Sequence, residues 1–165
     1  MPDSPVPEWI MERQRDEADR KRQDEQDAQS QSATAHSLRV DGPKFWKRLL
    51  ARLEVNVNAL TLLPDELNGS VSPGDGTAES PELSCHVEVN RRSTARGAAS
   101  AMLNLYYLKG GARIRRYDHR ELGDITLEVR HDVLAVIDDK PPKTAEELAD
   151  HIVSTMAEPM LLRRS

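Results

Sequence analysis

The chain has little cysteine and no apolar run long enough to cross a bilayer, which takes about 20 residues. Cys85 is the only cysteine, so an internal disulfide bond is excluded. This suits a reducing compartment, and we expect a cytoplasmic location without membrane association. The N-terminus lacks a basic segment followed by an apolar run, so we expect no secretory signal.

Large apolar residues are absent from residues 12–37, where nothing apolar exceeds alanine in size. Most of these residues favour helix, and a helix that is polar all round has no face to bury. We therefore predict a long, polar, protruding helix within an extension over residues 1–40. Near its start, Trp9, Ile10 and Met11 have no apolar surface on this helix to cover them. They predict an interface anchor that docks back on the domain or inserts into a second subunit or partner, which leaves oligomerisation through this helix open.

A second, amphipathic helix is predicted over residues 41–63. Asp41-Gly42-Pro43 favours a helix start there, because proline suits a first turn. Apolar residues recur on one face at helical spacing, namely Trp46, Leu49, Leu50, Leu53, Val57 and Leu60. The opposite side carries Lys44, Lys47, Arg48 and Arg52. A solvated helix face is favoured there over a binding surface.

The remainder of the chain predicts an α+β fold. Residues 64–82 are rich in proline, glycine and acids and predict an acidic flexible linker. In residues 83–165, apolar and polar residues alternate in several short segments, and Gly110-Gly111 predicts a hairpin turn. We expect an antiparallel meander of four or five strands, with a C-terminal helix packed on the sheet. That helix begins with a capping box of Thr144 and Glu147, and residues 41–165 are predicted to form one globular domain.

Charge is distributed unevenly along the chain. Residues 91–120 hold eight basic residues and a single acid, Asp118, which gives a net charge of +7 in a chain whose total is −5. The basic residues are Arg91, Arg92, Arg96, Lys109, Arg113, Arg115, Arg116 and Arg120. A local positive field of this kind attracts acidic segments, phosphates or nucleic acid.

Within residues 113–117, the alternation of a strand places side chains on opposite faces of the sheet. Arg113 and Arg115 share one face with Tyr117, whereas Arg116 shares the other with Ile114. The predicted partner- or anion-binding residues are Arg91, Arg92, Arg96, Arg113, Arg115, Arg116, Tyr117 and Arg120. Pairing of these arginines with the chain's own acids is the competing interpretation. The sequence pI of 5.6 favours that interpretation over nucleic-acid binding.

No catalytic, metal-binding or phosphate-binding motif accompanies the basic stretch. The five histidines are scattered without ligand spacing, so we expect no metal and no cofactor. The leading hypothesis is a non-enzymatic protein-interaction module, such as an adaptor, a chaperone-like factor or an inhibitor, with an acidic protein partner. One alternative is nucleic-acid or phosphate-ligand binding through residues 91–120. The other is a small enzyme of unrecognised type that uses His119, His131 or Asp138.

Overall fold

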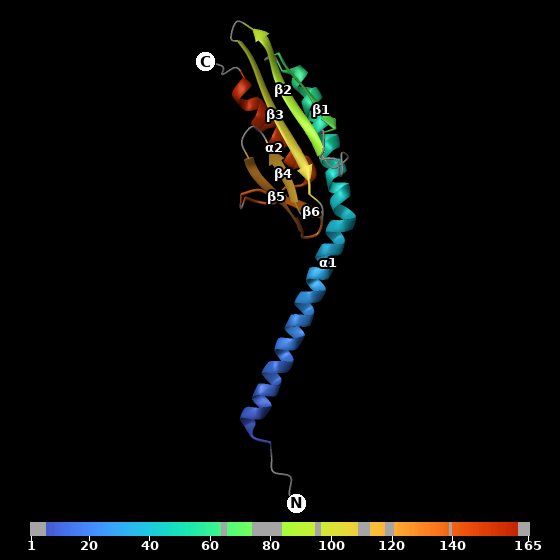
Figure 1. Ribbon diagram of the computed structural model, residues 1–165, viewed down its shortest axis with the longest axis vertical. Helices are drawn as coiled ribbons and strands as arrows, with labels where there is room; N and C mark the ends of the chain where they lie inside the picture. Colours follow the sequence, from blue (N-terminus) through green and yellow to red (C-terminus); the bar gives the residue numbers. More distant parts are fainter. Residues whose placement is uncertain are drawn as a thin grey trace, which may run out of the picture. The chain divides into compact units, whose positions relative to one another are not determined.

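The structure is a computed structural model that describes residues 6–63, 66–73, 84–94, 97–108, 113–117, 121–138 and 140–161 (Figure 1). The side chains of residues 93, 94 and 121–123 are outside this description. The chain divides into two units, residues 1–36 and residues 37–165. Within the described residues, no helix combines the length and the apolar character that a bilayer crossing requires.

Helix α1 is one continuous helix, Glu8–Ala59, followed by the 3-10 turn η1, Leu60–Leu62. The prediction of two N-terminal helices, with the second starting at Asp41-Gly42-Pro43, is therefore wrong. Pro43 lies inside α1, where its ring cannot donate the usual backbone hydrogen bond. Buried residues continue at helical spacing on both sides of this proline. Leu38 and Gly42 precede it, and Phe45 follows it. The continuous apolar stripe explains why packing carries the helix past the proline.

The predicted apolar stripe of this region is confirmed in most positions. Trp46, Leu49, Leu53, Val57 and Leu60 are buried, whereas Leu50 is only partly buried. The ring of Trp46 stacks on that of Tyr107 with centroids 5.6 Å apart. This contact joins α1 directly to the sheet.

The sheet has six antiparallel strands in the order β1 to β6, so the predicted meander is confirmed and its predicted size of four or five strands is too small. The strands are β1 (Leu67–Pro73), β2 (Ser84–Thr94), β3 (Gly97–Tyr107), β4 (Arg113–Tyr117), β5 (Glu121–Val129) and β6 (Val133–Val136). Each strand pairs with its neighbour in sequence. The predicted turn at Gly110-Gly111 lies outside the described residues.

Strand β1 is a strand that the sequence did not predict, and it occupies part of the segment predicted as a flexible linker. Its residues pair in register with β2, from Leu67 opposite Arg91 to Pro73 opposite Cys85. A Cβ at Gly69 would clash with the Glu88 carbonyl oxygen and the Val57 side chain. The glycine therefore permits a close approach to α1, although its lack of a side chain hid the strand from the sequence pattern.

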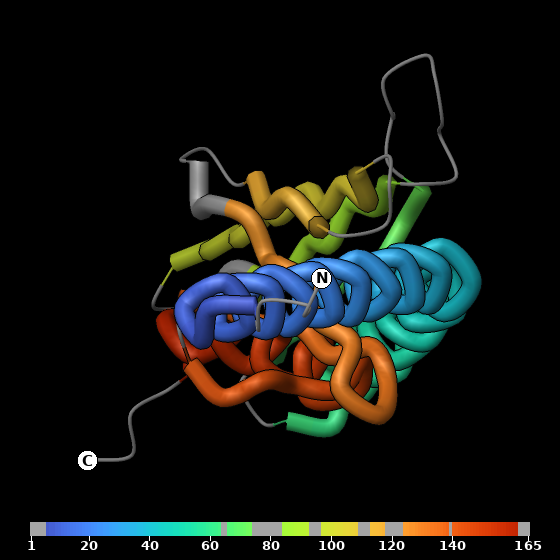
Figure 2. Tube along the Cα trace, turned by 90° about the horizontal axis from the view of Figure 1, so that it is seen from below, coloured from blue at the N-terminus to red at the C-terminus, as the bar shows by residue number. Residues whose placement is uncertain are grey.

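One face of the sheet supplies the core. Alternate residues of the strands are buried, such as Val87 and Val89 in β2 and Leu103 and Leu105 in β3. These residues share a single cluster with the buried residues of α1 and α2. Figure 2 shows the teal end of α1 and α2 (red) on the same side of the sheet. The described residues between 37 and 161 thus form two layers, with helices over one face of the sheet.

Helix α2, Ala145–Ala157, confirms the predicted C-terminal helix and its cap. The Thr144 hydroxyl accepts from the Glu147 backbone N–H at 3.2 Å, and the Glu147 carboxylate accepts from the Thr144 N–H at 2.9 Å. The helix buries Leu148, Ala149, Ile152 and Val153, while Met156 is partly buried. A 3-10 turn, η3 (Glu158–Met160), follows and contains Pro159.

Candidate functional site

The face of the sheet opposite the helices is the first candidate surface, and we call it the open face. At its centre, three side chains lie opposite one another across the strands β3, β4 and β5. Tyr106 of β3 lies opposite Arg115 of β4, and Arg115 lies opposite Asp124 of β5. The Arg115 Nε donates to Asp124 Oδ1 at 3.1 Å. Asp124 therefore partly offsets the charge of Arg115.

Two exposed residues of β4 lie on either side of Arg115. Arg113 lies opposite Thr126, and Tyr117, which is 49% exposed, lies opposite Asn104. In the described part of the chain, no carboxylate lies within ion-pair distance of Arg113. The four residues Tyr106, Arg113, Arg115 and Tyr117 form what we call the Arg–Tyr row. Arginine and tyrosine are residue types enriched at the energetic centres of protein interfaces.

The remaining predicted arginines do not all join this row. Arg116 lies opposite Leu105, a core residue, and so belongs to the helix-covered face. Arg91 donates from Nη1 to the Met160 carbonyl oxygen at 3.0 Å, which ties β2 to the end of η3. Arg92 is exposed, and its backbone N–H donates to the Glu66 carbonyl oxygen. Arg96 and Arg120 lie outside the described residues.

The basic side of α1 contributes to internal contacts rather than only to a solvated face. Arg48 donates to both oxygens of Glu146, at 2.9 and 2.8 Å, and Arg52 Nε donates to Asp150 at 2.9 Å. These hydrogen bonds lower the pKa of both Glu146 and Asp150. These partly exposed ion pairs link α1 to α2 at the surface of the protein.

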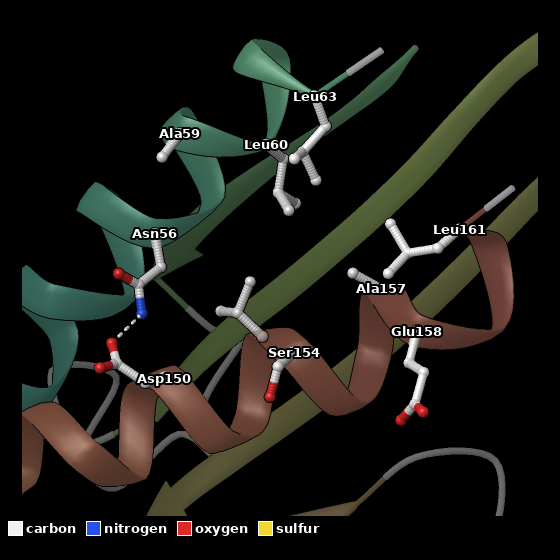
Figure 3. A pocket seen from close by; sticks show the side chains of 10 residues that line it. Asn56, Ala59, Leu60, Leu63, Asp150, Ser154, Ala157, Glu158 and Leu161 are labelled. Atoms are coloured by element: carbon white, nitrogen blue, oxygen red, sulfur yellow. Dashed lines mark hydrogen bonds between the residues drawn. The ribbon is translucent and has the colours of Figure 1, made fainter. Parts of the chain in front are cut away.

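Beyond these ion pairs, the two helices border an apolar groove that the sequence did not reveal (Figure 3). Leu60 and Leu63 line one side, and Ala157 and Leu161 line the other. Asn56 Nδ2 donates to Asp150 Oδ1 at 2.7 Å at one end. Because its two sides lie about 100 residues apart in sequence, no local pattern could have predicted this groove.

The predicted N-terminal anchor belongs to the first unit. Trp9 is 64% exposed and Met11 is 51% exposed, while Ile10 is partly buried. All three residues fall in the first turns of α1. Their predicted role as an interface anchor stays a prediction.

The residues considered for catalysis do not form a cluster in the described structure. His131 and Asp138 are exposed, and His119 lies outside the described residues. Among the residues that the structure covers, no group of three or more His, Cys, Asp or Glu side chains could hold a metal ion. Cys85 is buried in β2, and burial raises the pKa of its thiol to about 12. The thiol is therefore un-ionised near neutral pH and packs as a small apolar group.

Comparison of the chain with protein-family models, with curated proteins and with solved structures finds no match.

Proposed function

We propose that this protein is a protein-interaction module whose open face binds an acidic segment of a partner protein. The observation that carries the proposal is the Arg–Tyr row, with Arg113 and Tyr117 exposed on a face of the sheet that lies opposite α1 and α2. The proposed role is recognition, as in an adaptor, a chaperone-like factor or an inhibitor.

Charge supports an acidic partner. On the open face, Arg115 pairs with Asp124, and Glu121 of β5 lies opposite Tyr117, whereas no carboxylate of the described residues lies within ion-pair distance of Arg113. A partner carboxylate could form a two-pronged hydrogen bond with Arg113, while the rings of Tyr106 and Tyr117 cover the partner's apolar atoms. The surrounding stretch, residues 91–120, adds a positive field that speeds the encounter with an acidic segment.

The test uses isotope-labelled full-length protein and nuclear magnetic resonance. A short peptide rich in glutamate and tyrosine is titrated in, and so are a lysine-for-glutamate version of that peptide and a single-stranded oligonucleotide. We expect the acidic peptide to shift the amide signals of β3, β4 and β5, whereas the lysine version leaves them unchanged. Binding should weaken as salt concentration rises, because the contact is electrostatic.

Charge reversal on two surfaces localises the effect. The double substitution Arg113→Glu and Arg115→Glu should weaken peptide binding by about tenfold or more, about 1.4 kcal/mol. The control is Arg39→Glu with Lys47→Glu, which makes the same change of charge at exposed positions of α1. Equal weakening by both double variants would contradict a local site on the open face. Binding of the oligonucleotide but not the acidic peptide would instead support the nucleic-acid alternative.

A further inference from the structure

A separate pocket lies on the helix-covered side of the sheet, between α2 and the strands β3 and β4. Its volume is about 240 Å³. It is lined by apolar and cationic side chains, among them Leu103, Arg116, His151, Ile152, Thr155 and Met156. This combination of apolar walls and few polar groups is typical of sites for small molecules.

The pocket arises from a difference in strand length. Strand β3 extends from Gly97 to Tyr107, but its pairing with β4 covers only the last part, up to Asn104 opposite Tyr117. Residues 101–103 of β3 line the pocket beyond this last pair. Arg116, near the end of β4, lies at the border between the paired region and the pocket.

Two groups that can carry positive charge line the pocket, Arg116 from β4 and His151 from α2. Lys140 and Lys143 precede α2, and their charges act on His151. Burial lowers the pKa of His151, and the charges of Lys143, Lys140 and Arg116 lower it further. The carboxylate one turn earlier on α2, that of Glu147, is engaged in the helix cap with Thr144. An anion placed in this pocket would meet the guanidinium of Arg116 and would favour the charged form of His151.

We propose that this pocket binds a small organic monoanion, a carboxylate that carries a short aliphatic or aromatic group. The carboxylate lies between Arg116 and His151, within reach of the Thr155 hydroxyl, and the apolar group packs against Leu103, Ile152 and Met156. The site is distinct from the open face, so it stands or falls independently of the proposed protein-binding role.

Size and chemistry both favour such a ligand. Pockets for drug-sized ligands measure about 300–1,000 Å³, so this pocket suits a smaller molecule. Hydrogen bonds between a guanidinium or imidazolium and a carboxylate are charge-assisted and stronger than neutral ones. Inorganic phosphate alone would leave the apolar walls uncovered, so it should bind more weakly than the carboxylate.

The experiment is a calorimetric and magnetic-resonance titration of the full-length protein with benzoate, benzamide, benzylamine and inorganic phosphate. We expect benzoate to bind and to shift the Met156 methyl signal, and benzamide and benzylamine not to bind. The pKa of His151, followed through its ring protons, should rise when benzoate is present, because the anion favours the imidazolium. Benzoate affinity should also increase as pH falls below the ordinary histidine value of 6.5, since His151 then gains charge.

A matched pair of arginine substitutions locates the site. Arg116→Gln should weaken benzoate binding by about tenfold to a hundredfold, whereas Arg39→Gln, at an exposed position of α1 outside both proposed sites, should leave it unchanged. If Arg116→Gln fails to fold, His151→Gln provides the second variant, which should remove the pH dependence of binding. Equal binding of benzoate and benzamide, an unchanged pKa of His151 with benzoate, or no binding of benzoate would each overturn the proposal.

Discussion

The two parts of helix α1 share one secondary structure but owe it to different causes. Residues 12–36 are almost entirely exposed, and the hydrogen bond from Gln23 to Asp27 is an example of a contact within the helix itself. Residues 38–57 bury a stripe that includes Phe45, Trp46, Leu49 and Leu53. Local propensity and pairs four residues apart support the first part, whereas tertiary packing supports the second. The difference teaches that helical structure alone says little about how strongly a segment resists unfolding.

Pro43 lies in the packed part of α1, residues 38–57. A proline in a helix interior costs about 3 kcal/mol or more. The helix nevertheless continues, since the residues before and after the proline belong to one core cluster. The same penalty in the exposed part would have no packing to offset it.

The largest predicted effect comes from placing a new proline in each part. Ala51→Pro removes a backbone hydrogen bond among packed turns and should lower the free energy of unfolding of residues 37–165 by about 3 kcal/mol or more. Ala28→Pro should reduce the helical circular-dichroism signal but leave the thermal midpoint of the sheet-containing unit unchanged. An equal loss of midpoint in both variants would contradict the division of α1 into two differently supported parts.

Core truncation should give the next largest contrast. Leu49 is 0% exposed, so Leu49→Ala should destabilise the protein by about 2–5 kcal/mol through lost burial and the cavity left behind. Gln26→Ala, at an exposed position of the same helix, should change the stability by no more than about 0.5 kcal/mol. Chemical denaturation followed by circular dichroism measures both values. A small effect of Leu49→Ala would show that this part of α1 is not packed as described.

The smallest expected difference in stability between the two parts of α1 comes from removing a charged side chain. Arg48 holds the pKa of Glu146 below its ordinary value of 4.5, so this ion pair stabilises the folded state above pH 4.5 and its contribution is lost as pH falls through the lowered pKa. The two side chains are 46% and 42% exposed, so solvent screens the pair and Glu146→Gln should cost only about 0.2–1 kcal/mol at neutral pH. Asp27→Asn, in the exposed part of α1, serves as the control and should have less effect. Denaturation of each variant at neutral pH and below pH 4 measures the difference. A cost for Glu146→Gln that persists in acid would argue against the ion pair as its source.

Local patterns predicted the elements whose signals are complete within a few residues. The alternation of β2, the capping box at Thr144 and Glu147, and the apolar stripe from Trp46 to Val57 are all present in the structure. Local patterns failed where one residue carries a signal that packing overrides. Pro43 predicted a helix start inside α1, and Gly69 and Pro73 of β1 contributed to the prediction of a linker.

The candidate site was only partly predictable for the same reason. Period-two alternation placed Arg113, Arg115 and Tyr117 on one face and Arg116 on the other, and the strand register agrees with it. Tyr106 and Asp124 were missed, because they join Arg115 only through pairing with neighbouring strands. The groove between α1 and α2 and the pocket beside Arg116 were missed because their walls come from separate elements.

The sequence by itself determined the α+β class, the antiparallel meander, the capped C-terminal helix and the charge contrast along the chain. Each of these depends on side-chain periodicity, capping chemistry or composition, all of which act over short distances in the chain. The tertiary structure decided that α1 is continuous, that β1 joins the sheet and which cations face which surface. Those outcomes depend on contacts between distant segments, whose packing energy outweighs the local preference of any single residue.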